Sequence, residues 1–354
     1  NFSRSPRISG LKNDLAAGTT VQARSTRCDR PFETRQPIPS AHKVALCAID
    51  VGQPVHRYGQ VIGFATAPIA RGDHVHTHNL GVQDFEREYA IGVDADPPEL
   101  VPETERRTFA GYLRPNGRVG TRNYVALIST VNCSAHVTRA IAHHFTPERL
   151  ADYPNVDGVI ALTHHTGCSY RLGGPDYQIL GRTLAGMARH PNIGAYAFVG
   201  LGCETTQIDA VIEDHGLRQA ASPPQEGPTG GPINEPIGLV IQDLGGVKRT
   251  VQAGIAAIQE MLPRVNRFER TPQPISELLL ALQCGGSDAW SGVTANPLVG
   301  ALSDRLVVQG GSVLAAEIPE VYGAEQLLLR RAVSAEVGQK LLDQIRWWEK
   351  HAEQ

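Results

Sequence analysis

Unbroken apolar runs alternate with amphipathic stretches from residue 109 onward. Strands without polar positions suit a parallel sheet buried on both faces. Six runs of this kind are predicted to be strands, over residues 124–131, 156–163, 195–200, 237–243, 277–283 and 312–317. After the first run, Val137, Ile141 and Phe145 recur every four residues, which indicates the apolar face of a helix. The alternation predicts doubly wound α/β units.

The pattern differs in the first part of the chain. Residues 1–85 hold short alternating segments between Gly and Pro turns, which predicts a small all-β domain. Residues 86–107 are acidic and contain prolines, which is typical of an extended linker. The Pro- and Gly-rich segment 222–236 predicts a boundary between two α/β domains, at residues 108–235 and 236–354.

Four cysteines each follow an apolar run: Cys133, Cys168, Cys203 and Cys284. The first two intervals are equal, because 168 − 133 and 203 − 168 are both 35. A strand–crossover–strand unit takes roughly 30 residues or more, so these cysteines are predicted to share one edge of a parallel sheet, where ligands bind. Thiolates and imidazoles favour Fe(II), zinc or an iron–sulfur cluster. The alternative is buried thiols, or thiols that only line the site.

Histidines form two further motifs. His164 and His165 follow the second run and are candidates for a general base and for a metal ligand or acid. One of them could equally be a buried, hydrogen-bonded histidine. In the first domain, His74, His76 and His78 would share one face of a strand, which could bind metal or an anionic substrate. The alternative is a solvated edge of a small β domain.

Two glycine-containing motifs suggest contacts with a carboxylate. Arg122 lies in GRVGTRN just before the first long run, and arginine can bind a carboxylate through two hydrogen bonds. Ser287 and Asp288 follow a Gly pair and precede a helix, which suggests a cradle for an anion. Ordinary turns would explain both motifs as well. The glycine spacing does not match a dinucleotide fingerprint, so a nicotinamide cofactor is disfavoured.

Composition narrows the class of protein. The chain has 354 residues, 41% of them hydrophobic and 19% charged, which suits a globular protein of several domains. A net charge of −3 offers no broad basic surface for nucleic acid or an anionic membrane. No apolar run approaches the roughly 18 residues of a membrane span. Six cysteines in apolar contexts favour a reducing cytoplasm.

Several motifs in fixed order resemble the altronate/galactarate dehydratase family: GYLRPNGRVGTRNY, VNCS, THHTGC, GLGCE, QCGGSDAWSGVTANP and EIPEVYGAE. The segment that contains HVHTHN is similar to the SAF (β-clip) domain of that family. The resemblance runs from about residue 10 to residue 351. It implies a β-clip domain, a linker and a Rossmann-like parallel sheet, in a homodimer. The chain lacks an initial Met and stops where relatives continue for about another small domain.

The resemblance also implies an activity and roles for residues. Members remove water from a sugar acid, such as galactarate or altronate, to give a 2-keto-3-deoxy acid, with a divalent metal that is typically Fe²⁺. The four cysteines would then line or ligate the metal or a cluster, and His164 or His165 would be the base. The expected substrate contacts are Lys43, His76, His78, Arg122, Ser287 and Asp288. A sulfolactate sulfo-lyase and a non-catalytic protein that binds sugar acids remain alternatives.

Overall fold

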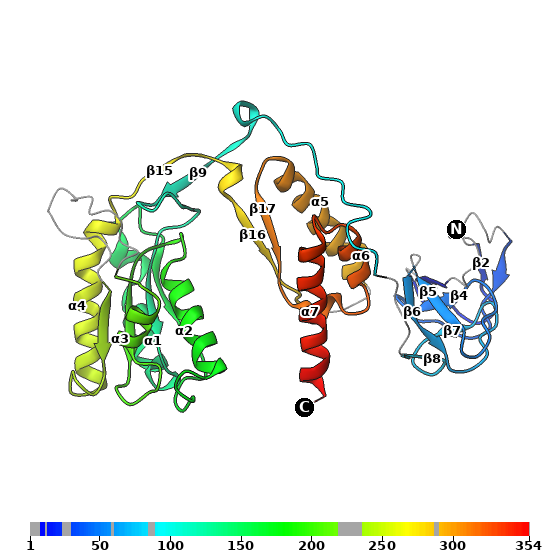
Figure 1. Ribbon diagram of the computed structural model, residues 1–354, viewed down its shortest axis with the longest axis horizontal. Coiled ribbons are helices and arrows are strands. Elements are labelled where there is room, and N and C mark those ends of the chain that lie inside the picture. Colours follow the sequence, from blue (N-terminus) through cyan, green and yellow to red (C-terminus); the bar gives the residue numbers. More distant parts are fainter. Residues whose placement is uncertain are drawn as a thin grey trace. The chain divides into compact units, whose positions relative to one another are not determined.

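The computed structural model describes residues 8–10, 13–22, 30–57, 60–83, 89–218, 236–286 and 290–353. The chain divides into two compact units (Figure 1). One unit combines residues 1–99 with residues 280–308 and 313–354. The other unit comprises residues 100–279 and 309–312. Most of the second unit is therefore a single continuous segment, whereas the first unit joins two distant parts of the chain.

The N-terminal part of the first unit is a small β domain, as the alternating segments predicted. Its strands pair antiparallel in three sheets. These contain β1 (Ile8–Gly10), β4 (Lys43–Ala45) and β7 (His74–Val75); β5 (Pro54–Arg57), β6 (Gln60–Ala65) and β8 (Leu80–Gly81); and β2 (Thr20–Val21) with β3 (Phe32–Glu33). Apolar side chains from several of these strands, including Ala45, Val55 and Val75, form a shared core.

The second unit is built on a four-stranded parallel sheet, which confirms the predicted architecture. The order is β12 (Gly158–Leu162), β11 (Tyr124–Ser129), β13 (Ile193–Gly200) and β14 (Ile237–Val240). Helices α1 (Ala135–His144) and α4 (Val247–Val265) cover one face, and α2 (Pro175–Ala188) and α3 (Ile208–Asp214) cover the other (Figure 1). Alternate side chains of β11 enter the two cores, which explains why its residues 125–128 are all apolar.

The boundary predicted between residues 235 and 236 falls inside this unit. β14 pairs with β13, and Ile258 and Leu262 of α4 are buried against the same sheet. The proline-rich stretch that suggested the boundary lies outside the described residues up to residue 235. A second sheet of the unit joins β10 (Val119–Gly120), β9 (Thr108–Leu113) and β15 (Arg270–Pro274) in antiparallel pairs.

The C-terminal part of the first unit contains a two-stranded sheet and three helices. Strands β16 (Leu279–Leu282) and β17 (Ser312–Ala315) are neighbours. Hydrogen bonds from Ser312 to Leu278 and from Ala316 to Leu282 advance together along both strands, as in a parallel pair. The helices are α5 (Ala295–Val308), α6 (Glu325–Arg330) and α7 (Ala335–Ala352). Short 3₁₀ turns occur at Glu103–Glu105, Asn132–Ser134, Pro147–Leu150, Ile275–Glu277, Ser291–Val293 and Ile318–Val321.

Part of the predicted linker is anchored rather than free. The backbone N–H of Gly92 donates to Leu329, and that of Asp94 donates to Arg330, with N···O distances of 2.9 and 2.8 Å. Arg330 also forms an ion pair with Asp94. Residues 95–102 then continue without helix or strand. The linker therefore begins at a fixed attachment to α6.

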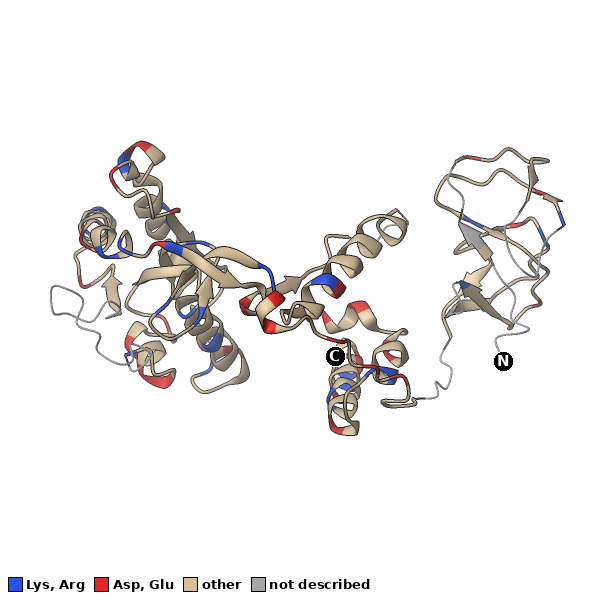
Figure 2. Ribbon diagram, turned by 90° about the horizontal axis from the view of Figure 1, so that it is seen from above, with Lys and Arg blue, Asp and Glu red and all other residues tan. Residues whose placement is uncertain are grey.

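Charged residues of both signs are interspersed along the ribbons of both units (Figure 2). This distribution agrees with the small net charge of −3. Among the described residues, no helix is both long enough and apolar enough to cross a membrane.

Candidate functional site

Three cysteines follow three adjacent strands at the carboxyl edge of the parallel sheet. Cys133 follows the central strand β11, and Cys168 and Cys203 follow its neighbours β12 and β13. The backbone N–H of Asn132 donates to Thr166 at 2.9 Å, which holds the loops after β11 and β12 together. All three thiols are exposed. The predicted shared edge is confirmed for these three cysteines, which are not buried core residues. It is wrong for Cys284, which follows β16 of a different sheet.

The three thiols influence one another. Desolvation raises the pKa of the Cys133 thiol, and its interactions with Cys168 and Cys203 raise it further. Without a cation, the Cys133 thiol therefore resists deprotonation. Within the described ranges, no three His, Cys, Asp or Glu side chains form a set that could hold a single metal ion. The sulfur atoms are thus neighbours, but they do not form a closed site for one ion.

Glu204 fixes the turn that carries Cys203. Its buried carboxylate accepts hydrogen bonds from Thr130 Oγ1 at 2.7 Å, from the Leu201 N–H at 3.1 Å and from the Gly202 N–H at 2.7 Å. The Thr130 bond joins the ends of β11 and β13. A Cβ on Gly200 would lie 2.5 Å from Glu204 Oε1, so a larger residue here would displace the carboxylate from its hydrogen bonds. The carboxylate is therefore engaged in holding the turn.

His164 is half-buried, and both of its ring nitrogens have partners. Nε2 donates to the carbonyl of Ser129 at 3.0 Å, which leaves Nδ1 to accept the Thr166 N–H at 3.3 Å. Burial lowers the pKa of His164, and the bond to Ser129 partly opposes this effect. The neutral ring holds the loop between β12 and Cys168. The imidazole of His165, in contrast, is exposed.

Arg139 supplies a cation at the same edge, which the sequence analysis did not find. Its Nη2 donates to Thr163 Oγ1 at 3.1 Å, and its side chain is exposed. Helix α1 begins two residues after Cys133, so Arg139 lies in the second turn above the thiols. The signal in the sequence was its position six residues after Cys133, on the helix that starts from this edge.

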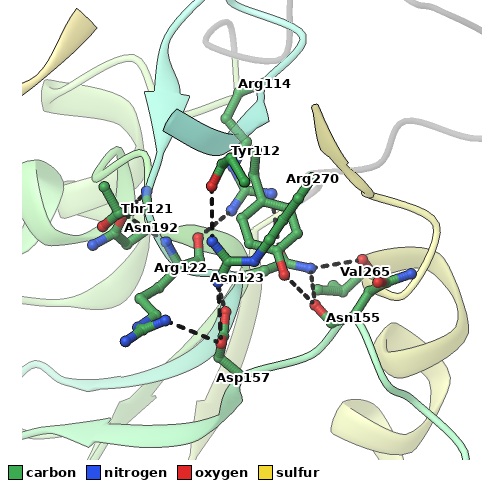
Figure 3. Close-up of polar contacts among 11 residues, drawn as sticks. Tyr112, Arg114, Thr121, Arg122, Asn123, Asn155, Asp157, Asn192, Val265 and Arg270 are labelled. Atoms are coloured by element: carbon green, nitrogen blue, oxygen red, sulfur yellow. Dashed lines mark hydrogen bonds and ion pairs between the residues drawn. The ribbon is translucent and has the colours of Figure 1, made fainter. Parts of the chain in front are cut away.

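The structure places Arg122 at the opposite edge of the sheet. Arg122 precedes β11, and a residue before a parallel strand lies at the amino edge, away from the cysteines. Its Nη1 lies 3.8 Å from Asp157 Oδ1, and Asp157 also accepts the Asn123 N–H at 2.6 Å (Figure 3). Arg270 pairs with the same carboxylate at 3.5 Å. This arrangement connects β11 to the preceding sheet and does not bring Arg122 to the thiols.

Four histidines meet in the N-terminal β domain. His42 Nδ1 lies 2.8 Å from His74 Nε2, and the rings of His42 and His76 stack with centroids 4.8 Å apart. The ring of His78 is 5.4 Å from that of His74. The predicted strand face is wrong, because β7 ends at Val75 and the chain turns through residues 76–79. The turn nevertheless brings the rings together, and His42 joins them from the segment before β4.

These histidines lie in a positively charged environment. Desolvation lowers the pKa of His74 to about 4, with further contributions from the charges of His42, His78, His76 and Lys43. Burial and the charge of Arg57 likewise lower the pKa of Lys43. Lys43 supplies positive charge beside these rings, and imidazole N–H groups can donate hydrogen bonds to an anion. The cluster formed by His42, His74, His76, His78 and Lys43 is therefore suited to bind a carboxylate.

Cys284 belongs to the first unit and follows strand β16 by two residues. Its backbone N–H donates to Glu317 Oε2 at 2.7 Å, and Glu317 follows the neighbouring strand β17. The backbone of Glu317 has φ = 67°, a left-handed conformation that is uncommon for a residue with a side chain. Ser287 and Asp288 lie outside the described residues. The three cysteines of the second unit are thus brought together, and Cys284 has a separate environment.

An antiparallel β domain, an anchored linker and a parallel α/β unit define a multidomain α/β protein whose chemistry-bearing side chains gather at strand ends. Three family models match it: the altronate/galactarate dehydratase SAF domain at residues 10–83, the D-galactarate dehydratase/altronate hydrolase second domain at 111–266, and the D-galactarate/altronate dehydratase C-terminal region at 275–354. The chain belongs to the altronate/galactarate dehydratase family.

Curated relatives agree with this assignment. The chain is 33% identical over 320 residues to altronate dehydratase of Bacillus subtilis, covering 89% of this chain and 59% of the relative. It is 34% identical over 342 residues to galactarate dehydratase (L-threo-forming) of Escherichia coli, covering 96% and 62%. The (2R)-sulfolactate sulfo-lyase subunit beta of Chromohalobacter salexigens is 31% identical over 239 residues, covering 67% and 54%. The chain therefore spans about six tenths of the length of the dehydratases.

Proposed function

We propose that this chain dehydrates a sugar acid, such as galactarate or altronate, to a 2-keto-3-deoxy acid. The single observation that carries the proposal is the gathering of three thiols, His165 and Arg139 at one sheet edge in a member of this family. The reaction removes the proton from C2 and the hydroxyl from C3 as water. The resulting enol then tautomerises to the keto acid.

In the second unit, separate residues bind the substrate and transfer the proton. Arg139 binds the substrate carboxylate, because its guanidinium is exposed and held beside β12 by Thr163. His165 removes the C2 proton, because it is the accessible member of the histidine pair. His164 positions the loop and stays neutral, since both nitrogens are engaged. His76, His78 and Lys43 serve as carboxylate contacts in the β domain.

A divalent metal, expected to be Fe²⁺, completes the proposal. The exposed sulfurs of Cys133, Cys168 and Cys203 would line the edge at which it acts, but among the described residues no three donor side chains form a set that could hold the ion. When bound, the metal supplies Lewis acidity that stabilises the negative charge developing on the substrate carboxylate. The family resemblance supports assembly as a homodimer, and the sparse cysteines of the chain support a cytoplasmic location.

A panel of acids tests the reaction. The full chain, kept anaerobic with Fe²⁺ and a thiol reductant, is incubated separately with galactarate, altronate and sulfolactate. We expect a 2-keto-3-deoxy acid from a sugar acid, detected by NMR. Release of sulfite from sulfolactate alone would instead support the sulfo-lyase reaction, which the similarity to the sulfo-lyase subunit keeps as the second candidate.

Substitutions at two histidines test the assignment of the base. His165→Asn should lower kcat by about 10²- to 10⁴-fold, the usual contribution of a general base. His136→Asn is the matched control, because His136 is an exposed histidine on α1. Equal loss of kcat in the two variants, or no loss in His165→Asn, would remove His165 from the mechanism.

A further inference from the structure

We propose that the histidine cluster of the β domain is an oxyanion site that is complete within this domain and recognises the carboxylate group of a ligand rather than its hydroxyl groups. Its members are His42, Lys43, His74, His76 and His78. The inference deepens the proposed function, because it rests on a sugar acid as the natural ligand. Binding of the carboxylate is nevertheless separate from dehydration and can be measured alone.

The register of two antiparallel strands brings the members of the cluster together. Lys43 of β4 pairs with Val75 of β7. One residue further along, the same register places His42 opposite His76, and directly opposite residues of an antiparallel pair are close neighbours. The rings of these two histidines stack with their planes 9° apart, which agrees with this placement. Strand pairing thus assembles the cluster from two distant segments.

Asn79 fixes the turn that carries His76 and His78. The side chain of Asn79 is buried; its Oδ1 accepts the His76 N–H at 3.0 Å, and its Nδ2 donates to the His74 carbonyl at 2.9 Å. The backbone N–H groups of Asn79 and Leu80 donate to the His76 carbonyl at 3.0 and 2.9 Å. The turn therefore has a defined backbone before a ligand arrives, which reduces the entropy lost on binding.

The hydrogen bond inside the cluster leaves an N–H donor for a ligand. His42 Nδ1 lies 2.8 Å from His74 Nε2, so one of these rings donates and the other accepts. A neutral imidazole has one N–H, so the ring that accepts carries its proton on its other nitrogen. In either arrangement the pair therefore retains one N–H donor. Lys43 adds positive charge beside these rings.

The charges around the cluster are complementary to an anion. The charged side chains that act on His74 are all basic: His42, Lys43, His76 and His78. The adjacent carboxylate of Asp73 is engaged elsewhere, because it forms an ion pair with Arg35 at 3.1 Å and accepts a backbone hydrogen bond within its own turn. Arg57 adds positive charge beside Lys43. Charge-assisted hydrogen bonds to an oxyanion would use this environment.

The arrangement favours an anion over a metal ion. In the described part of the chain, no three His, Cys, Asp or Glu side chains form a set that could hold a cation. His76 and His78 are exposed, whereas His42, Lys43 and His74 are half-buried. A carboxylate can therefore approach from solvent and meet half-buried donors, whose charge interactions are less screened than those of exposed groups.

Titration of the full chain with succinate tests the inference without an activity assay. Succinate has carboxylates and no hydroxyl groups, and succinamide is its uncharged control of the same length. We expect succinate to shift the NMR signals of the imidazole protons of His42, His74, His76 and His78, assigned from single His→Gln variants. The signals of His56, in the same domain, and of His136, on α1, should stay in place.

Two outcomes of this titration would count against the site. Equal shifts with succinamide, or with sodium chloride at the same ionic strength, would mean that the rings do not respond to a carboxylate, and would overturn the inference. Inorganic phosphate is the other source of an oxyanion. Tighter binding of phosphate than of succinate would identify phosphate as the ligand and contradict the carboxylate assignment.

Two substitutions in the cluster locate the ligand. Lys43→Met keeps the apolar stem of the side chain, and His76→Gln changes an exposed side chain, so both variants should keep the wild-type melting temperature. Each should weaken the binding of succinate about tenfold or more, as expected when a hydrogen bond to a charged group is lost. Lys248→Met, at an exposed position of α4, is the matched control and should bind like the wild-type protein. Undiminished binding in both cluster variants would contradict the proposed site.

Arg139→Gln tests whether the site is complete within the β domain. Arg139 is the proposed carboxylate contact of the second unit, where it donates to Thr163. Its replacement should leave the shifts of the four imidazole signals unchanged. Disappearance of these shifts would show that the ligand requires the second unit, and would overturn the inference.

The two proposals fail in different ways. Dehydration of a sugar acid by a chain whose four imidazole signals ignore succinate would leave the function intact and reject the site. Succinate-induced shifts in a chain that dehydrates no sugar acid would leave the site intact and reject the function.

Discussion

Glu204 is a buried carboxylate that positions the Cys203 thiol by holding the turn that carries it. Leu201 donates to Oε1 of Glu204 and Gly202 donates to Oε2. Glu204→Gln replaces one of these oxygens by an NH₂ group, which cannot accept, so one of the two backbone N–H groups loses its acceptor. An unsatisfied buried group costs about 1–3 kcal/mol, so we expect a loss of this size in the free energy of unfolding in urea.

Asp209→Asn is the control for this substitution. Asp209 is an exposed carboxylate, and its closest cation, Arg218, is 4.0 Å away. The free energy of unfolding should change by no more than about 0.5 kcal/mol. Equal unfolding midpoints for the two variants would mean that Glu204 does not hold the turn.

His74 makes the stability of the protein depend on pH. Its pKa is about 4 in the folded chain, against 6.5 for an ordinary histidine. Between these values the unfolded state binds the additional proton, so the free energy of unfolding should fall as the pH is lowered from 6.5 toward 4. Above pH 6.5 both states are neutral at this residue, and the effect vanishes.

The pH dependence is measured from the melting temperature between pH 7.5 and 4.5, relative to a variant without the group. His74→Gln should flatten the curve, whereas His56→Gln, a half-buried histidine of the same domain outside the cluster, should not. Parallel curves for the wild-type protein and His74→Gln would contradict the lowered pKa.

Single residues also show the limits of the sequence analysis. The equal intervals between Cys133, Cys168 and Cys203 predict that they lie close together. Residues that follow successive parallel strands lie at the same edge of the sheet. Arg139 and His42 were missed because their partners, Thr163 and His74, come from separate segments. The position of Arg122 was misjudged because a motif close to a strand in sequence can lie at either of its ends.

At the scale of elements, an apolar run was sufficient to predict a strand where the segment is buried on both faces of its sheet. The predicted strand 124–131 corresponds to β11 at Tyr124–Ser129, and the runs at 195–200 and 312–317 correspond to β13 and β17. β15 was missed because its sequence, RTPQP, contains two prolines. It lies at the edge of its sheet, where proline is tolerated, and it carries no apolar period.

Two helical glycines test the packing of α1 on α4. A Cβ on Gly254 of α4 would overlap Ile141 of α1, which is fully buried. Gly254→Ala should therefore lower the free energy of unfolding by about 1–3 kcal/mol, the usual cost of overpacking, despite the better helix propensity of alanine.

Gly186→Ala provides the matched control in α2. A Cβ on Gly186 has open space around it, so alanine should raise stability by up to about 1 kcal/mol. Replacing glycine by alanine should thus lower the free energy of unfolding in α4 and raise it in α2, two helices of one unit. Stabilisation by Gly254→Ala would contradict the close contact of α1 and α4.

For the whole molecule, the compact units do not coincide with the domains that the order of segments along the chain predicts. The sequence predicts a break near residue 235, but β14 and α4 complete the parallel sheet of the second unit. The sequence also did not predict that the linker is attached to α6, because this attachment joins residues 236 positions apart. Local composition carries no information about such a distant partner.

The attachment of the linker can be tested by proteolysis. A side chain at Gly338 of α7 would meet Ile91, since a Cβ there lies 2.6 Å from Ile91 Cγ2. Gly338→Leu should displace the linker and increase cleavage within residues 89–99 about fivefold, which corresponds to roughly 1 kcal/mol of lost docking. Mass spectrometry locates the cuts.

Gly300→Leu is the control for this experiment. Gly300 lies on α5, and a Cβ there has open space around it. Cleavage of residues 89–99 should proceed at the wild-type rate. The same rate in Gly338→Leu would show that the linker is not held by α7.

The anchored linker also sets an order of events during synthesis. The β domain has its own core among residues 8–80, so it can fold as soon as it leaves the ribosome. Asp94 must wait for Arg330, which is translated 236 residues later. At 5–20 residues per second, this interval is on the order of 10 to 50 s. The intervening α/β unit has time to fold during this delay, so the bond between the two distant parts of the chain forms among the last.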